Sequence, residues 1–238
     1  MISVIVPAYN EQNRIGKTLD ALSSYMQNNF NGDEYEILVV SDGSKDGTND
    51  VVKNHPGKNV SLLSYEKNRG KGGAVKYGIE NAKGDIIIFT DADLPYPPES
   101  IKKAAEMFEK EKFDLILGSR VISEQGKKYP WYRTIMSRAF SMLVDMVLKL
   151  HVPDTQCGFK CFRKSAADNI FKKSTLVGWG FDVELIFIAK KRGYLIGRIP
   201  VSLSHENDGS KIRVLEATKT MIGEVLKVKE NNKNGLYD

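Results

Sequence analysis

Two aspartates separated by one residue follow the most apolar short segment of the chain. Asp91 and Asp93 come after residues 86–90, a run with the length and composition of a buried strand. Such a strand would deliver both carboxylates to its own carboxyl end. Hard divalent cations such as Mg²⁺ and Mn²⁺ bind few protein oxygens and share the rest of their shell with a diphosphate. The pair is a candidate metal site, and its spacing leaves a helix-capping turn as the alternative.

Two more polar segments follow predicted strands. Asp42 is placed to accept a hydrogen bond from a nucleotide base or ribose, whereas Asp46 is a suitable cap for the next helix. The glycine-rich segment 68–73, which includes Lys71, offers backbone N–H groups and positive charge near a helix N-terminus. These features predict an anion site. The segment does not match the dinucleotide fingerprint, because Val75 stands where the third small residue belongs.

Asp182 lies at a junction between a loop and a predicted helix. It could cap the helix, anchor the structure or act as a general base, and the residues alone favour the cap. Nucleophilic hydrolysis is not indicated, because the chain has no Gly-x-Ser-x-Gly elbow and its three histidines have no recognisable Ser or Cys partner. Cys157 and Cys161 form neither a disulfide framework nor a zinc motif, which predicts two small partly buried thiols.

The first half of the chain alternates strand-like and helix-like segments. Strands are expected at residues 3–6, 36–40, 60–65, 85–90 and 114–118, with helical patterns at 15–26, 46–52 and 101–108. This alternation predicts an α/β fold with a mainly parallel, doubly wound sheet and helices on both faces. In such sheets, functional groups gather at the carboxyl ends of the strands, where the motifs above lie.

The regular alternation of strand-like and helix-like segments ends near Tyr129. We expect a long helix at 134–150, a turn and strand at 153–162, a helix at 179–191, a strand at 198–204 and a final helix at 213–230. Because no repeat or low-complexity linker appears, we expect a single domain, 1–238, with a C-terminal helical elaboration. The helix at 134–150 has one narrow polar stripe, and aromatic and basic residues precede it. It suits a membrane interface or burial against the sheet.

Composition narrows the class of protein. The 238 residues are 41% hydrophobic and 27% charged, which predicts a folded core rather than disorder. The net charge of +5 is scattered, without a block of five like charges, so no nucleic-acid partner is expected. The longest apolar stretch, 140–150, is shorter than the roughly 20 residues that span a bilayer. With no signal-peptide pattern after Met1, we expect a cytoplasmic protein.

Seven motifs carry a resemblance to glycosyltransferase family 2, whose fold is GT-A. In the first half these are VIVPAYNE (4–11), VVSDGSKDGT (39–48), NRGKGGAVKYGI (68–79) and TDADLP (90–95). In the second half, DTQCGFK (154–160), WGFDVEL (179–185) and ENDGSKI (206–212) resemble the polyprenyl-phosphate hexosyltransferase branch, dolichyl-phosphate β-glucosyltransferases in particular.

The resemblance implies a role for each matching residue. The nucleotide would be bound by Pro7, Ala8, Tyr9, Glu11, Asp42, Lys71 and Asp91. Asp91 and Asp93 would hold Mg²⁺ or Mn²⁺, and Asp93, Arg120 and Arg133 would act on the leaving diphosphate and the acceptor phosphate. Ser137, Asp182 and Lys211 would lie on the acceptor side. Residues 1–120 would form the nucleotide-sugar half and 121–238 the acceptor and lipid-facing half.

The resemblance also implies an activity: inverting transfer of a hexose from a nucleotide diphosphate sugar to a polyprenyl phosphate, with UDP-glucose favoured. GDP-mannose as donor, a sugar hydroxyl as acceptor with Asp182 or Glu184 as base, and a non-catalytic nucleotide-binding module remain alternatives. A sugar-1-phosphate nucleotidyltransferase would need a glycine-rich loop where this chain has PAYNEQ. Members usually carry a membrane anchor and this sequence shows none, so a peripheral contact at the cytoplasmic membrane face is expected. The oligomeric state is left open.

Overall fold

The computed structural model describes residues 1–121, 131–202 and 214–238, except for the side chains of 121, 131–138 and 214–219. The strands in this part of the chain are β1 (Ile2–Ala8), β2 (Tyr35–Asp42), β3 (Val60–Tyr65), β4 (Ile86–Phe89), β5 (Leu115–Val121), β6 (Lys160–Arg163) and β7 (Ile196–Ser202). The helices are α1 (Ile15–Asn29), α2 (Thr48–Lys53), α3 (Lys71–Asn81), α4 (Glu99–Lys110), α5 (Trp131–Leu148), α6 (Lys164–Lys173), α7 (Phe181–Lys191) and α8 (Val214–Lys233).

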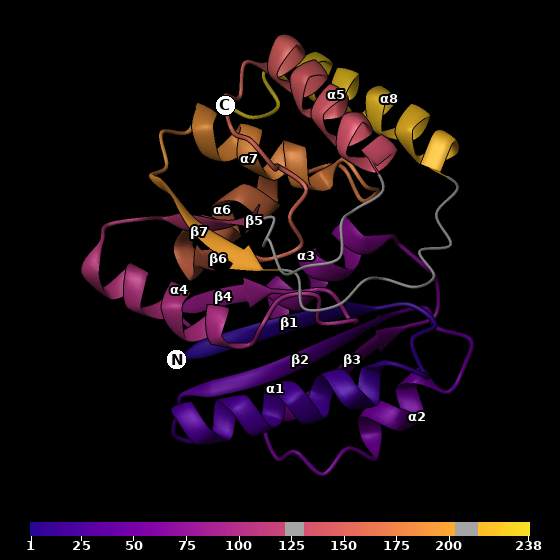
Figure 1. The fold of residues 1–238 in the computed structure, drawn as a ribbon, viewed down its shortest axis with the longest axis vertical. Coiled ribbons are helices and arrows are strands. Elements are labelled where there is room, and N and C mark those ends of the chain that lie inside the picture. Colours follow the sequence, from indigo (N-terminus) through magenta and orange to yellow (C-terminus); the bar gives the residue numbers. More distant parts are fainter. Residues whose placement is uncertain (122–130, 203–213) are drawn as a thin grey trace.

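The seven strands form one sheet in the order β3-β2-β1-β4-β6-β5-β7 (Figure 1). Strand β6 pairs antiparallel with both β4 and β5, and the other strands run parallel to one another. The mainly parallel sheet expected from the sequence is therefore confirmed. In the β4–β6 register Phe89 lies opposite Lys160, so β6 begins at the edge where β1, β2 and β4 end.

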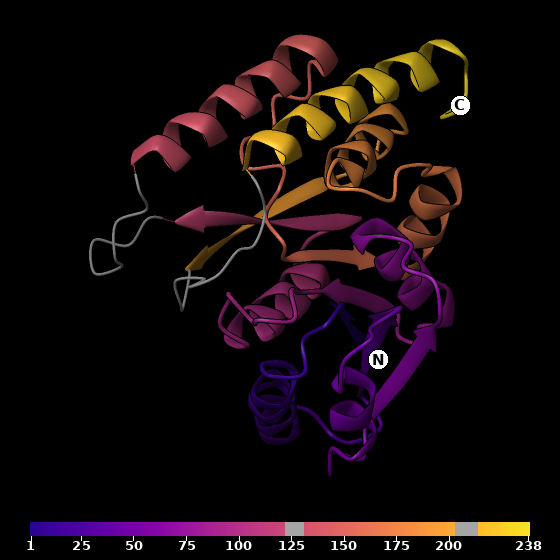
Figure 2. The same ribbon diagram turned by 90° about the vertical axis from the view of Figure 1, so that its right-hand side faces the viewer.

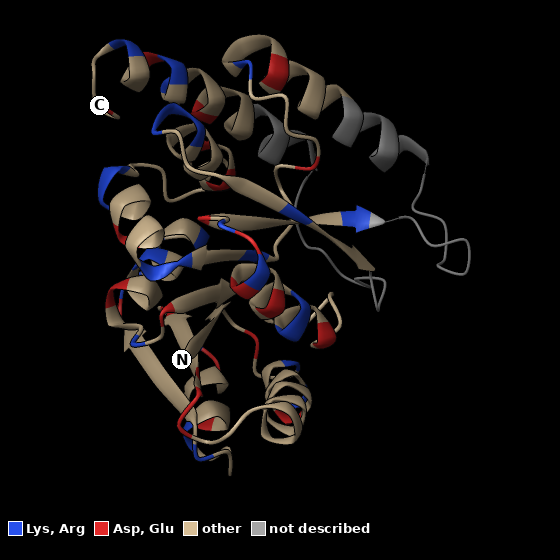
Figure 3. Ribbon diagram, turned by 90° about the vertical axis from the view of Figure 1, so that its left-hand side faces the viewer, with Lys and Arg blue, Asp and Glu red and all other residues tan. Residues whose placement is uncertain are grey.

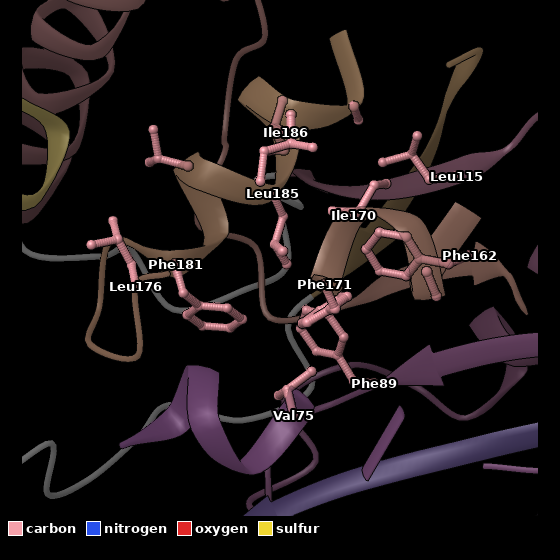
Figure 4. Packing of buried hydrophobic residues seen from close by; sticks show 14 of the residues in the cluster. Val75, Phe89, Leu115, Phe162, Ile170, Phe171, Leu176, Phe181, Leu185 and Ile186 are labelled. Atoms are coloured by element: carbon pink, nitrogen blue, oxygen red, sulfur yellow. The ribbon is translucent and has the colours of Figure 1, made fainter. Parts of the chain in front are cut away.

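Alternating side chains bury both faces of the sheet. On β1, Val4 and Val6 belong to the buried cluster that includes residues of α1 and α4, whereas Ile5 belongs to the cluster that includes residues of α3 and α7. This two-residue period is what a strand between two helical layers requires. The second face also buries rings from β4, β6 and α7: Phe89 stacks on Phe162 at 6.1 Å between centroids (Figure 4). Burying one such ring contributes about 1.5–3 kcal/mol.

Helix α3 lies directly against β1 and β2, which fixes the position of its N-terminus over the strand ends. A Cβ on Gly78 would meet Ile5 Cγ2 at 2.6 Å, so only glycine permits this close approach. Lys71, the first residue of α3, is thereby held beside the carboxyl end of β4.

Helices α5 and α8 lie side by side as an outer layer over α7 (Figures 1 and 2). Phe140 and Val144 of α5 are buried, while Met142 and Met146 on the same helix are 66% and 75% exposed. Helix α5 therefore has one buried and one exposed apolar face. No helix in the described part of the chain is long and apolar enough to cross a membrane.

The last turns of α6, α7 and α8 carry lysines, visible in Figure 3. Positive charge there is favourable because the last carbonyls of a helix carry partial negative charge. The lysines thus stabilise the C-terminal ends of these three helices.

Candidate active site

The loops after β1 and β2 are joined by reciprocal hydrogen bonds. The Asn10 side chain accepts the backbone N–H of Lys45 at 2.8 Å, and the Gln12 side chain accepts that of Gly47 at 2.7 Å. In return, Asp46 accepts the backbone N–H of Gln12 at 3.2 Å. The two loops therefore form one wall. The expectation that Asp46 caps α2 is wrong, because Gly47 is the N-cap; Asp46 instead joins the two loops and accepts the backbone N–H of Thr48 at 3.0 Å.

The residues expected to bind nucleotide line this wall. Pro7 and Ala8 end β1, and Tyr9 follows with half of its surface exposed. Glu11 pairs with Arg14 at 2.8 Å. Burial raises the pKa of the Glu11 carboxyl, an effect that Arg14 opposes.

Asp42 is held at the end of β2 by two donors. The Tyr65 hydroxyl and the Arg69 backbone N–H each donate to Asp42 Oδ1 at 2.7 Å. The Arg69 guanidinium lies over the Tyr65 ring, 4.3 Å from its centroid, which holds both donors in place. Sequence reasoning missed Tyr65, for which its place at the end of the neighbouring strand was the available signal, and counted Arg69 only as part of the glycine-rich anion site.

Asp91, Asp93 and Lys71 meet beyond the end of β4. Lys71 Nζ lies 2.5 Å from Asp91 Oδ1. Burial favours the neutral amine, but the charges of Asp91, Asp182 and Asp93 outweigh it and raise the pKa of Lys71 to about 12. Lys71 is therefore a cation at neutral pH. Burial and the charge of Asp91 raise the pKa of the Asp93 carboxyl.

This donor set fits a hard divalent cation. A cation bound between the two carboxylates would relieve their mutual repulsion, and oxygen is the ligand type that Mg²⁺ and Mn²⁺ prefer. Among the described residues, no group of three or more His, Cys, Asp or Glu forms a closed metal site. The pair thus suits an ion that takes few protein ligands and completes its shell with phosphate oxygens.

Gly158 is pressed against Asp91. A Cβ at this position would lie 2.0 Å from Asp91 Oδ2, so the close approach requires glycine. The Gly158 backbone N–H donates to the buried Tyr96 hydroxyl at 3.1 Å. This contact fixes the segment before β6 against the carboxylate.

Asp182 forms a buried ion pair with Lys160. Lys160 Nζ lies 2.5 Å from Asp182 Oδ1 and donates to the Cys157 carbonyl at 2.6 Å, and Lys160 is only 1% exposed. The expectation that Asp182 caps α7 is wrong, because Gly180 is the N-cap and no side chain caps that end. Asp182 instead has the role of a structural anchor, which was one of the alternatives left open by the sequence. Lys160 was missed, although a lysine among the apolar residues of a strand predicts a buried partner.

Glu184, the other carboxylate considered as a base, serves the fold. It is fully buried and accepts the backbone N–H groups of Thr175 and Leu176 at 2.9 and 2.8 Å. The Tyr237 hydroxyl donates to it at 2.6 Å. Its oxygens therefore bind the loop before α7 and the last residues of the chain.

Arg120 points toward Asp154. Its Nε and Nη2 contact Asp154 Oδ1 at 3.0 and 2.5 Å, and its backbone N–H donates to Asp154 Oδ2 at 2.9 Å. Much of this guanidinium is thus already paired within the chain. Arg133 and Ser137 are in α5, but their side chains lie outside the described part, as does all of Lys211.

Comparison with known proteins places these motifs in a family. The sequence model described as Glycosyl transferase family 2 matches residues 3–171, more than half of the chain. The chain belongs to glycosyltransferase family 2. This match confirms the enzyme class expected from the motifs, and the mixed seven-stranded sheet agrees with the GT-A fold.

This family 2 glycosyltransferase is similar to proteins named dolichyl-phosphate beta-glucosyltransferase. The Dictyostelium discoideum protein is 35% identical over 241 residues, covering 96% of this chain and 73% of the relative. The Homo sapiens protein is 34% identical over 225 residues, covering 89% and 69%.

Solved structures support the fold. Glucosyl-3-phosphoglycerate synthase from Mycobacterium tuberculosis, solved with Mn²⁺, UDP and glucosyl-3-phosphoglycerate, has a TM-score of 0.73 and 18% identity. The match covers 97% of this chain and 80% of that one. At this identity the likeness establishes the GT-A fold of the glycosyltransferase alone.

Proposed function

We propose that this glycosyltransferase transfers glucose from UDP-glucose to a polyprenyl or dolichyl phosphate and inverts the anomeric carbon to a β linkage. The similarity to dolichyl-phosphate beta-glucosyltransferases over most of the chain supports the donor and the acceptor. The observation that carries the acceptor class is the buried Asp182–Lys160 pair. A carboxylate held this way is suited to fixing the chain rather than to taking a proton from an alcohol.

A phosphate acceptor needs no such base. A phosphate monoester has a second pKa of about 6, so it is already a nucleophilic anion at neutral pH. It would attack the face of the anomeric carbon opposite the leaving diphosphate, which gives the β product from an α-linked donor. Asp182 then positions Lys160 and the start of α7 without joining the proton transfers.

Breaking the sugar–diphosphate bond develops negative charge on the leaving group. Asp91 and Asp93 would hold Mg²⁺ or Mn²⁺, which when bound neutralises charge on the diphosphate. Lys71 adds a fixed positive charge beside the same group, since it stays protonated at neutral pH. Asp42, oriented by Tyr65 and Arg69, accepts a hydrogen bond from the nucleotide.

We assign binding of the acceptor to the second half of the chain. Residues 1–120 bind the nucleotide sugar, and 121–238 bind the acceptor, with Arg133, Ser137 and Lys211 near its phosphate. Arg120, because it is paired with Asp154, contributes mainly by orienting the end of β5.

Calorimetry with UDP and GDP tests the donor. We expect the chain to bind UDP in the presence of Mg²⁺ or Mn²⁺ at least about tenfold more tightly than GDP. Asp42→Asn removes a charge-assisted hydrogen bond and should weaken UDP binding about tenfold to a hundredfold. Asp50→Asn, on the exposed side of α2, is the matched control and should bind UDP normally. Tight GDP binding without UDP binding would favour a GDP-mannose donor.

A peripheral membrane contact, at the cytoplasmic face, is part of the same proposal. Met142 and Met146 of α5 and Leu226 of α8 are more than half exposed on the outer helical layer. An amphipathic surface of this kind binds the interface of anionic vesicles. Vesicle flotation should recover the chain, less at high salt, and Met142→Glu with Met146→Glu should abolish recovery. Leu195→Glu changes an exposed leucine that lies before β7 and not on α5 or α8, and it should leave recovery unchanged. Equal recovery of the two variants would show that α5 does not make the contact.

A further inference from the structure

The loop between α6 and α7, residues 174–180, exposes two large apolar side chains beside the candidate active site. Val177 is 49% exposed and Trp179 is 45% exposed. Leu176 and Phe181, which flank them, are buried in the core cluster (Figure 4). Asp182, whose charge acts on Lys71, follows Trp179 by three residues, so the loop runs directly into the candidate active site.

One side of this loop is fixed to the start of α3. The Gly72 backbone N–H donates to the Val177 carbonyl at 3.0 Å. Gly70 approaches the same carbonyl so closely that a Cβ there would lie 2.5 Å from the oxygen. Lys71 stands between these two glycines, so Val177 is held next to the cation that contacts Asp91.

The other side of the loop is fixed to α8. Glu224 Oε2 accepts the Gly180 backbone N–H at 2.7 Å. A Cβ on Gly178 would lie 2.1 Å from Glu224 Oε1, and one on Gly180 would lie 2.7 Å from Glu224 Cβ. The glycines on both sides of Trp179 thus lie flat against Glu224, which holds the indole in an exposed position.

We infer that Val177 and Trp179 form the subsite for the isoprenoid chain of the acceptor, at the end next to its phosphate. This inference rests on the proposed function. The acceptor phosphate must approach the sugar beside the diphosphate that Lys71 faces. Its apolar chain then needs an apolar surface next to Lys71, and this loop supplies one. Two side chains are too small a surface for a stable protein partner, which buries about 800 Å² on each side.

Trp179→Ala should raise the KM for geranyl phosphate, a short water-soluble acceptor, about tenfold or more, because the indole no longer covers the chain. UDP affinity should be unchanged, and Trp179→Phe should keep a KM within about threefold of wild type. Leu195→Ala, which changes an exposed leucine that lies before β7, is the matched control. An unchanged geranyl phosphate KM in Trp179→Ala would overturn the inference. So would a loss confined to acceptors embedded in vesicles, which would assign Trp179 to bilayer contact.

Tryptophan fluorescence tests the subsite without turnover. The chain has two tryptophans, so Trp131→Phe leaves Trp179 as the only indole emitter. Its emission should shift to shorter wavelength with geranyl phosphate and stay unchanged with inorganic phosphate. No shift with geranyl phosphate would contradict the subsite, even in an enzyme that transfers glucose to it. If wild type transfers to no polyprenyl phosphate, the proposed function fails, and the fluorescence result still decides whether this loop binds an isoprenoid.

Discussion

Asp93→Asn should reduce glucosyl transfer at saturating donor by about a hundredfold to a thousandfold. The substitution removes one of the two carboxylates proposed to hold the cation, and lost charge stabilisation of this kind costs about 2.7–4 kcal/mol in the transition state. Burial and Asp91 already disfavour the charged form of Asp93, so the free energy of unfolding should fall little or rise. Single-turnover rates with Mg²⁺, Mn²⁺ and EDTA measure the loss of transfer. Urea unfolding measures the change in the free energy of unfolding.

The matched control is Asp33→Asn, which changes an exposed carboxylate away from the site. It should retain the wild-type rate and the wild-type dependence on metal. Full activity of the wild-type enzyme in excess EDTA, or of Asp93→Asn with metal, would show that transfer does not depend on a cation held by Asp93.

Gly158→Ala should impair the same site without changing any charge. The new methyl group would lie 2.0 Å from Asp91 Oδ2, so the carboxylate or the segment before β6 must shift. We expect transfer to fall at least about tenfold, because small displacements of catalytic groups are costly. Overpacking should also lower the free energy of unfolding by about 1–3 kcal/mol. Initial rates across a metal titration, with urea unfolding of the same preparation, make the measurement.

Gly32→Ala controls for the added methyl group, since no atom lies within 4 Å of its Cβ position. It should match the wild type in rate and in metal dependence. If Gly158→Ala did the same, the close contact with Asp91 would have no catalytic consequence.

The sequence predicted the first half of the fold well because each strand there is short, apolar and followed by a polar loop. The carboxyl ends of parallel strands meet at one edge, so Asp42, Lys71 and Asp91 could be placed together before their contacts were seen. The specific contacts of Asp42 were not predicted, because Tyr65 and Arg69 are distant from Asp42 in sequence and reach it through tertiary packing.

The second half was harder to predict because its key contacts are long-range. Helix α6 went unrecognised, although Ala166, Ala167, Ile170 and Phe171 bury one face of it. It begins immediately after β6, with no turn residues to mark the boundary. The reversed direction of β6 has no local signature either, and that reversal is what brings Lys160 to the edge where β4 ends.

The roles of Asp182 and Arg120 were also hard to predict, because each side chain suits several functions. Asp182 sits where a helix cap is common, but a buried lysine from another strand outweighs the local preference. Arg120 resembles a phosphate ligand by position, yet Asp154, which is 34 residues away, binds its guanidinium. Such pairings depend on the fold and are seen only once the strands are assembled.

The central claim is that the acceptor nucleophile is a phosphate oxygen, and parallel assays with a short polyprenyl phosphate and the matching polyprenol test it most directly. The enzyme would be incubated with UDP-glucose and Mg²⁺ or Mn²⁺, and products from wild type and Asp182→Asn identified by mass spectrometry. We expect product from the phosphate and none from the alcohol. Asp182→Asn should reduce transfer in step with its loss of stability, about 3–5 kcal/mol, because it leaves the buried Lys160 without its anionic partner. Product from the alcohol at a comparable rate, abolished in an Asp182→Asn variant that remains folded, would contradict the account.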